Sequence, residues 1–308
     1  MIYTLTLNPA IDKTLELKSL EIGKLNRIFK SRKDASGKGI NVSKVIHSLG
    51  GKSVAMGFLG GSNGQFIRER LKTLGIAESF ITIEGETRVN TKVFDRSTKE
   101  ITEFNENGPN IKKSELKVML ETLKNTIQAD DYLIISGSAP SKIESNIYQK
   151  IIQMLSNGTK VILDADGELL KKGIKAKPYL IKPNIYELQN LAGKKLESYP
   201  EIEKAVQEIL KQGINAILVT MGAKGAYYFE KRFKYRLDPV DVEVKSTTGA
   251  GDAMIGGLVY TLYNKESIFR SLKKATACAA ASVTMEGTQP GPKELVEKLE
   301  EKVQIKEI

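Results

Sequence analysis

The sequence predicts a single α/β domain over residues 1–308, built as a three-layer α/β/α sandwich around a mostly parallel central sheet. Short apolar runs typical of buried strands alternate along the chain with longer amphipathic runs of helical period, a pattern that indicates a parallel sheet. Two other segments alternate apolar with polar residues, which is typical of strands with one solvated face. Hydrophobic residues make up 41% of the chain, enough for a sizeable core.

The first strand is expected within residues 1–9. Further buried strands are predicted at 54–59, 132–136, 160–164, 179–182 and 216–220. Helical patterns lie between them, at 41–49, 64–74, 114–128, 146–155, 187–191 and 201–212. Ligands bind beyond the carboxyl ends of parallel strands. We therefore expect the polar residues at four strand ends to share one face of the sheet: Ser136, Asp164, Lys182 and Thr220.

The two alternating segments, 13–32 and 88–104, are too few to form an independent domain. A small sheet made from them, placed over the mouth of the main domain, would act as a lid. No linker is long enough to divide the chain into two domains.

Composition narrows the functional classes. The single cysteine excludes an intrachain disulfide and fits a reducing cytosol, so we expect a cytoplasmic protein. The first residues lack signal-peptide features, and no apolar run reaches the length of a membrane span. The net charge of +10 comes from dispersed lysines, with no tryptophan to stack on bases. We therefore expect neither a nucleic-acid nor a membrane partner, although the positive field would attract phosphorylated small molecules.

The most informative motif is Thr247-Thr248-Gly249-Ala250-Gly251-Asp252, which an apolar helical run follows at once. Glycines one residue apart permit a sharp turn and a close approach to a ligand. The first turn of the following helix offers free N–H groups and the positive end of the helix dipole, which together bind phosphate. Asp252 in that turn could take a proton from a hydroxyl that attacks the phosphate, so the motif indicates a kinase.

A second glycine-rich turn, Gly37-Lys38-Gly39, opens a helix that carries Asn41. It lacks the spacing of a Walker loop and the third glycine of a dinucleotide fingerprint. Asp12 and Asn41 suit sugar hydroxyls, and Lys38 with nearby N–H groups suits a phosphate. A plain strand-to-helix turn is the alternative, and Arg88 is either a surface residue or a phosphate clamp.

Two further features fit a nucleotide site, each with a structural alternative, and a third resembles a metal loop. Asn184 and Glu187 could position the waters around Mg²⁺, or they could form only a capping box. Gly222 and Gly225 belong to a hairpin turn that could also face a nucleotide. The stretch that begins at Asp164 resembles a calcium loop but lacks the later ligands, so we interpret it as a turn on the active-site face.

Together these motifs resemble the ribokinase-like sugar kinases of the phosphofructokinase B type over essentially the whole chain. Segments 246–252, 3–12, 25–27, 37–43 and 87–92 carry the resemblance. It implies a ribokinase-like fold and ATP-dependent phosphorylation of fructose 1-phosphate on its 6-hydroxyl, which gives fructose 1,6-bisphosphate and ADP. The alternatives are a tagatose-6-phosphate kinase, a 6-phosphofructokinase and, more remotely, a catalytically silent sugar-phosphate sensor.

The resemblance also implies residue roles. Asp252 would be the general base, and the backbone of Gly249, Ala250 and Gly251 the anion hole. The sugar phosphate would be held by Asp12, Gly37, Lys38, Asn41, Arg88 and Ser138. ATP and Mg²⁺ would be lined by Lys182, Asn184, Glu187, Thr220, Gly222, Gly225 and Thr248, with Asn184 and Glu187 reaching the metal through water. Family members pair through their lids, which implies a homodimer, and this chain departs from the family pattern at Ser36 and Ala253.

Overall fold

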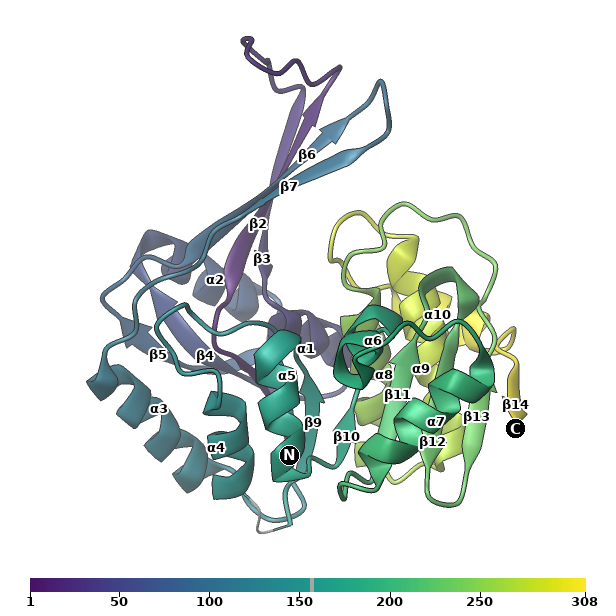
Figure 1. The fold of residues 1–308 in the computed structure, drawn as a ribbon. Helices are drawn as coiled ribbons and strands as arrows, with labels where there is room; N and C mark the ends of the chain where they lie inside the picture. Colours follow the sequence, from purple (N-terminus) through teal and green to yellow (C-terminus); the bar gives the residue numbers. More distant parts are fainter. Residues whose placement is uncertain (156–157) are drawn as a thin grey trace.

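The computed structural model describes residues 1–155 and 158–308, and within them a large central sheet carries helices on both faces (Figure 1). The strand order is β14-β13-β12-β11-β10-β9-β8-β1-β4-β5. The strands from β5 to β11 in this order pair in parallel, and β12, β13 and β14 extend the sheet antiparallel. The predicted α/β fold with a mostly parallel sheet is therefore confirmed.

The strands of this sheet are β1 (Ile2–Thr6), β4 (Val54–Gly60), β5 (Ala77–Ile83), β8 (Tyr132–Ser136), β9 (Lys160–Asp164), β10 (Leu180–Ile181), β11 (Ala216–Thr220), β12 (Ala226–Glu230), β13 (Lys234–Leu237) and β14 (Ile305–Glu307). The helices are α1 (Lys38–Ser48), α2 (Gly61–Thr73), α3 (Lys113–Thr126), α4 (Ile147–Met154), α5 (Gly167–Gly173), α6 (Ile185–Ala192), α7 (Tyr199–Leu210), α8 (Ala250–Tyr263), α9 (Ile268–Val283) and α10 (Lys293–Glu300). Short 3₁₀ turns occur at Ile174–Ala176 and Gly222–Lys224.

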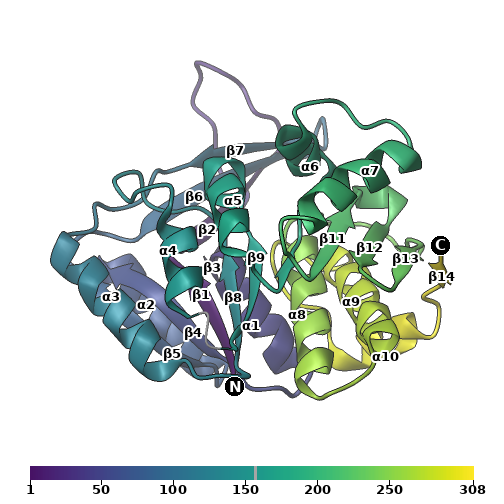
Figure 2. The same cartoon turned by 60° about the horizontal axis from the view of Figure 1, so that its bottom comes forward.

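The core has two layers because both faces of the sheet are covered. On one face, side chains of β1 and β8 pack with Met119 of α3, Ile151 of α4 and Val206 of α7. On the other, α1, α8 and α9 cover the sheet through residues such as Ile46 and Leu258. Figure 2 shows α8, α9 and α10 side by side on this second face. Successive residues along the central strands point alternately into the two layers, which accounts for their unbroken apolar runs.

Helices α8 and α9 pack closely because glycine stands at their contact. A Cβ at Gly257 of α8 would lie 2.7 Å from Cys278 Sγ and 2.9 Å from the Lys274 carbonyl oxygen of α9. Cys278 is 1% exposed, and burial raises the pKa of its thiol to about 12. The close approach fixes the position of α8, whose first turn carries the kinase motif.

A second, smaller sheet projects from the main body (Figure 1). Its strand order is β3-β2-β6-β7, with β2 (Ala10–Leu17), β3 (Lys30–Ser36), β6 (Arg88–Asp95) and β7 (Ile101–Asn105). β2 and β6 pair in parallel, and the two outer strands pair antiparallel. The predicted segment 13–32 thus contains most of β2, a long connection and the start of β3, while the segment 88–104 covers β6 and most of β7. We refer to this sheet as the lid sheet.

Within the described residues, no helix combines the length and the apolar character needed to cross a membrane.

Candidate active site

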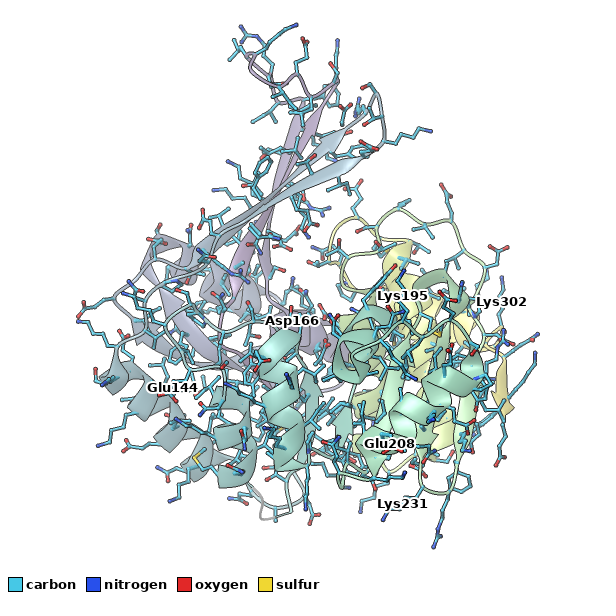
Figure 3. All side chains as sticks on the ribbon, viewed as in Figure 1. Glu144, Asp166, Lys195, Glu208, Lys231 and Lys302 are labelled. Atoms are coloured by element: carbon cyan, nitrogen blue, oxygen red, sulfur yellow. The ribbon has the colours of Figure 1, made fainter. Side chains whose placement is uncertain are left out.

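Polar residues gather at the carboxyl ends of four neighbouring strands. β8, β9, β10 and β11 are adjacent in the sheet, and Ser136 at the end of β8 pairs in register with Asp164 at the end of β9. The Lys182 N–H donates to the Leu163 carbonyl, and the Thr220 N–H donates to the Pro183 carbonyl. The expectation that these four strand ends share one edge is confirmed. Asp166, labelled in Figure 3, marks this edge, since it is the residue at the N-terminal boundary of α5, just after β9.

Asp164 is the electrostatic centre of this edge. Its side chain is 1% exposed, and its Oδ1 lies 3.3 Å from Lys182 Nζ and 3.4 Å from Lys38 Nζ. Burial raises the pKa of this carboxyl, but the charges of Lys182 and Lys38 outweigh burial, so its net pKa is lowered. The attraction of Asp164 raises the pKa of Lys38. Asp164 Oδ2 is buried without a hydrogen-bond partner, so one carboxylate oxygen remains for a ligand.

The kinase motif forms a tight turn into α8. Gly249 is the N-cap residue and has a φ of 86°, a left-handed conformation that favours glycine. The first intrahelical bond of this turn runs from the Ala253 N–H to the Gly249 carbonyl at 2.8 Å, and the Ala250 N–H makes a long 3.4 Å bond to the Thr247 carbonyl. N–H groups in a first helical turn lack intrahelical acceptors, so those of Gly251 and its neighbours can bind an anion.

Lys182 brings a positive charge to the same turn. A Cβ at Gly251 would lie 3.0 Å from Lys182 Nζ, so a side chain there would crowd the ammonium beside the helix N-terminus. An anion bound there would meet the dipole of α8 and the Lys182 charge together.

Asp252 lies in the first turn of α8 and is 6% exposed. Asn41 Nδ2 of α1 donates a 2.8 Å hydrogen bond to Asp252 Oδ2. Burial, with a smaller contribution from Asp164, raises the pKa of Asp252 to about 6. A carboxylate with such a pKa is ionised at neutral pH and is a stronger proton acceptor than an ordinary aspartate, which suits a general base.

The base of the lid sheet forms a polar wall around Asp12. Asp12 is 6% exposed, accepts from Ser36 Oγ at 2.9 Å and from Asn90 Nδ2 at 3.3 Å, and lies 3.4 Å from Lys92 Nζ. Asn90 Oδ1 is buried without a partner. Charged and amide groups with spare hydrogen-bonding capacity are the groups that bind sugar hydroxyls.

Arg88 and Ser138 meet through Asn8, which follows β1. Asn8 Nδ2 donates to Ser138 Oγ at 3.3 Å, and the Asn8 carbonyl accepts from Arg88 Nη2 at 3.0 Å. Arg88 Nη1 donates to the Glu106 carbonyl at 2.8 Å, and burial lowers the pKa of the guanidinium. Arg88 Nε is buried without a partner, so the fork retains a donor for an anion. Arg88 is therefore not simply a surface residue.

The glycine-rich turn that contains Lys38 joins the two regions. Gly37 caps α1 with a φ of 129°, and a Cβ there would clash with Thr6. Lys38 begins α1 and extends to Asp164, while Asn41, one turn later, reaches Asp252. The alternative interpretation is correct in that this segment is a turn from β3 into α1. The same turn also delivers two polar side chains to buried carboxylates.

The capping-box interpretation of Asn184 and Glu187 is also correct. The Glu187 N–H donates to Asn184 Oδ1 at 2.9 Å, and Glu187 Oε2 accepts from the Asn184 N–H at 2.8 Å. Burial raises the pKa of Glu187, and nearby Asp164 adds to the rise. The capping box uses Asn184 Oδ1 and Glu187 Oε2 and leaves Asn184 Nδ2 and Glu187 Oε1, so it does not prevent contact with metal-bound water.

The remaining predicted nucleotide residues occupy the turns beside this cluster. The backbone of Thr220 forms an isolated parallel β-bridge with that of Asn184. Gly222 has a φ of 58°, and a Cβ there would meet open space. Gly225 has a structural explanation, because a Cβ there would lie 2.1 Å from the Leu237 carbonyl oxygen. The Thr248 N–H donates to Ser246 Oγ at 3.3 Å in the turn before the anion hole.

The central position of Asp164 was not predicted, nor were the contacts of Asn8 and Asn90. Asp164 stands at a strand end, which was the available signal, but its two lysine neighbours come from the start of α1 and from the residue that follows β10. Asn8 and Asn90 belong to no recognisable motif. Their contacts, of Asn8 with Arg88 and Ser138 and of Asn90 with Asp12, arise only when the folded chain brings these residues together.

Comparison with known proteins shows which family this chain matches. Residues 2–294 match the family model described as pfkB family carbohydrate kinase. The chain is 38% identical over 283 residues to a 1-phosphofructokinase of Borreliella burgdorferi, covering 92% of this chain and 91% of that protein. It is 32% identical over 305 residues to a 1-phosphofructokinase of Vibrio cholerae, covering 99% and 96%. The structure of Escherichia coli phosphofructokinase-2 in complex with substrates and products matches with a TM-score of 0.93 at 27% identity, covering 98% of each chain.

Proposed function

This chain belongs to the pfkB family of carbohydrate kinases, and we propose from that premise that it phosphorylates fructose 1-phosphate on its 6-hydroxyl, using ATP. The observation that carries the reaction type is Asp252, buried at the start of α8 beside the anion hole and oriented by Asn41. The curated relatives named 1-phosphofructokinase support the choice of sugar.

In the proposed reaction, the 6-hydroxyl oxygen forms a bond to the γ-phosphorus of ATP while the bond from that phosphorus to the β,γ-bridging oxygen breaks. Asp252 takes the hydroxyl proton, and ADP leaves with the bridging oxygen. The first-turn amides of Gly249, Ala250 and Gly251 stabilise the equatorial oxygens, with Lys182 beside them. Such catalysis consists mostly of positioning and electrostatic stabilisation.

The sugar phosphate is proposed to lie between the lid sheet and α1. Asp12 and Asn41 would bind hydroxyls, and Gly37 would allow close backbone approach. Arg88 and Ser138 would hold the phosphate already present, since Arg88 keeps a buried donor without a partner. Lys38 lies with Asp164 and Lys182, so we assign its charge to the phosphates that face Asp252.

The nucleotide is proposed to lie over the ends of β10 and β11, against Thr220, Gly222, Gly225 and Thr248. The oxygen donors present fit Mg²⁺, because Asp164 has a buried oxygen without a partner and Glu187 is a carboxylate nearby. Glu187 and Asn184 would hold the ion through water, and Asp164 would supply a further carboxylate oxygen. When bound, Mg²⁺ would neutralise charge on the ATP phosphates.

We further propose that two copies associate through their lid sheets. Apolar side chains of β7 and of the connection between β2 and β3 are exposed: Ile22 at 93%, Leu25 at 81%, Phe29 at 58% and Phe104 at 57% exposure. Exposed apolar patches of this kind mark interaction sites.

A coupled ADP-release assay tests the substrate. We expect kcat/KM for fructose 1-phosphate to exceed that for tagatose 6-phosphate and fructose 6-phosphate by at least tenfold. A reversed order would favour one of the two rival kinases. Saturable sugar-phosphate binding without any product, with ATP and Mg²⁺ saturating, would favour the sensor and overturn the proposed catalysis.

A further inference from the structure

One face of β3 contacts two parts of the molecule: Asp12 of the lid sheet and the segment that follows α9. Arg32, Asp34 and Ser36 alternate along this strand and therefore share a face. At the lower end, Ser36 Oγ donates to Asp12 Oδ2 at 2.9 Å. Asp12 is also the register partner of Asp34. The face of β3 that contacts Asp12, the carboxylate proposed to bind the sugar, thus continues directly to the Arg32–Asp34 pair.

The upper part of this face contacts a segment made of the last residue of α9 and the loop that follows it, residues 283–289, which we call the support loop. Gln289 Nε2 donates to Asp34 Oδ1 at 2.7 Å, while Arg32 Nε donates to Asp34 Oδ2 at 2.8 Å. Arg32 Nη1 also reaches Glu286 Oε2 at 3.0 Å. The fit is close, since a Cβ at Gly287 would lie 2.0 Å from Arg32 Nη2.

The Asp34 contact is the buried part of this junction. The Asp34 side chain is 9% exposed, whereas that of Glu286 is 61% exposed. Lys44 of α1 faces Asp34 from below and donates to the Ala35 carbonyl, which fixes the adjacent residue of β3. A buried hydrogen bond to a charged group contributes more than an exposed ion pair, so Gln289–Asp34 is the contact to test.

The support loop also holds the segment that leads into the anion hole. The Val283 carbonyl accepts from the Lys245 N–H at 2.7 Å and from the Ser246 N–H at 3.1 Å. Thr288, 7% exposed, packs on Gly249, because a Cβ at Gly249 would lie 3.6 Å from Thr288 Cα and Cβ. The loop therefore touches both ends of the turn that presents the anion-binding amides.

We propose that Asp34 and Gln289 are positioning residues that couple the sugar site to the anion hole, so that sugar phosphate and ATP bind synergistically. The path runs from Asp12 through Ser36 and Asp34 on β3, then through Gln289 and Thr288 to Gly249. A ligand that fixes Asp12 also fixes the face of β3 against the support loop, and the support loop fixes Gly249. Coupling of binding free energies is reciprocal, so ATP must tighten sugar binding by the same factor.

A purely structural role makes a different prediction. If the junction only stabilised the fold, its loss would lower the melting temperature and weaken each ligand alone. If it couples the sites, each ligand alone binds normally and only the mutual enhancement is lost. The inference rests on the proposed function in that it requires a sugar phosphate at Asp12.

The test uses Gln289→Met, which keeps side-chain length and removes the donor, and Gln289→Glu, which places a like charge against Asp34. Calorimetry gives the affinity for fructose 1-phosphate with and without a non-hydrolysable ATP analogue and Mg²⁺. We expect the analogue to tighten sugar binding at least fivefold in the wild type and less than twofold in both variants. Each ligand alone should bind within twofold of wild type.

Glu286→Gln is the matched control, because it alters an exposed contact of the same junction and should retain wild-type synergy. Synergy retained in Gln289→Met, or absent from the wild type, would overturn the coupling, as would weaker binding of each ligand alone. If Gln289→Glu does not fold, Gln289→Met decides. Failure of the proposed function looks different: the wild type would then neither bind nor phosphorylate fructose 1-phosphate, and coupling from that sugar would fail with it.

Discussion

Asp252, the proposed general base, is ionised at neutral pH at an energetic cost. An aspartate in an unfolded chain has a pKa of about 3.9, whereas burial raises that of Asp252 to about 6. The folded state therefore binds the proton more tightly. The stability that this group contributes is fully present below about pH 4 and is lost as pH rises through about 6. At neutral pH the enzyme holds an ionised carboxylate in a place that favours its neutral form.

Replacing Asp252 with asparagine should therefore separate activity from stability. We expect kcat to fall by roughly 10²–10⁴-fold, because the hydroxyl proton loses its acceptor. The free energy of unfolding at pH 8 should rise by about 2 kcal/mol, because the variant no longer buries this charge. Steady-state kinetics and denaturant titration measure the two effects. Near-normal kcat would remove Asp252 from the mechanism.

The same pKa predicts the acid limb of the rate profile. Below pH 6 Asp252 is protonated and cannot accept the hydroxyl proton. We therefore expect kcat/KM to fall tenfold per pH unit below about 6 and to level off above about 7. A phosphate monoester also titrates near pH 6, so sugar binding by Asp252→Asn over the same range is the control. A limb centred near pH 4, after this correction, would contradict the assignment.

At the residue scale, the sequence identified groups whose chemistry is carried by a local motif. Asp252 was predictable because the glycines and the apolar helix surround it in the chain. The pairing of Asn41 with Asp252, across 211 positions, was not. Asp164 was predicted to lie at a strand end on the active-site face, but its role as a charge centre was not predicted, since the two lysines beside it come from other parts of the chain.

At the element scale, the packing of α8 on α9 can be tested with Gly257→Ala. In an open helix this change would stabilise by up to about 1 kcal/mol. Here the added methyl meets Cys278 and the Lys274 carbonyl, so we expect a net destabilisation of about 1–3 kcal/mol. Arg270→Ala, in an exposed pair on α9, is the control and should change stability by less than about 0.5 kcal/mol. Equal stability of the two variants would show that α8 and α9 can separate without cost.

The predicted central strands agree closely with the observed ones because each is an apolar run buried on both faces. Predicted segments 132–136, 160–164 and 216–220 coincide with β8, β9 and β11. β5 was missed, since as an edge strand it mixes exposed and buried positions. α9 was missed as well, although its alanine-rich face packs tightly on α8, because small residues give a weak periodic signal.

At the scale of the whole molecule, the lid sheet predicts the state of association. Leu25→Asp places a charge in the exposed apolar group of the lid, so we expect the mass in analytical ultracentrifugation to halve at micromolar concentration. Val118→Asp changes an exposed apolar residue of α3, away from the lid, and should leave the mass unchanged. Equal masses for wild type and Leu25→Asp would contradict association through the lid.

The chain's only thiol lies where α8 meets α9, at the Gly257 contact. Cys278 is 1% exposed, so a reagent that modifies thiols can reach it only when the packing around it opens, and the modification rate measures how often that happens. Because α8 carries Asp252, the proposed base, in its first turn, that rate reports the opening of the packing around this helix. The rate of Cys278 modification in the wild-type protein therefore measures this opening without an introduced label.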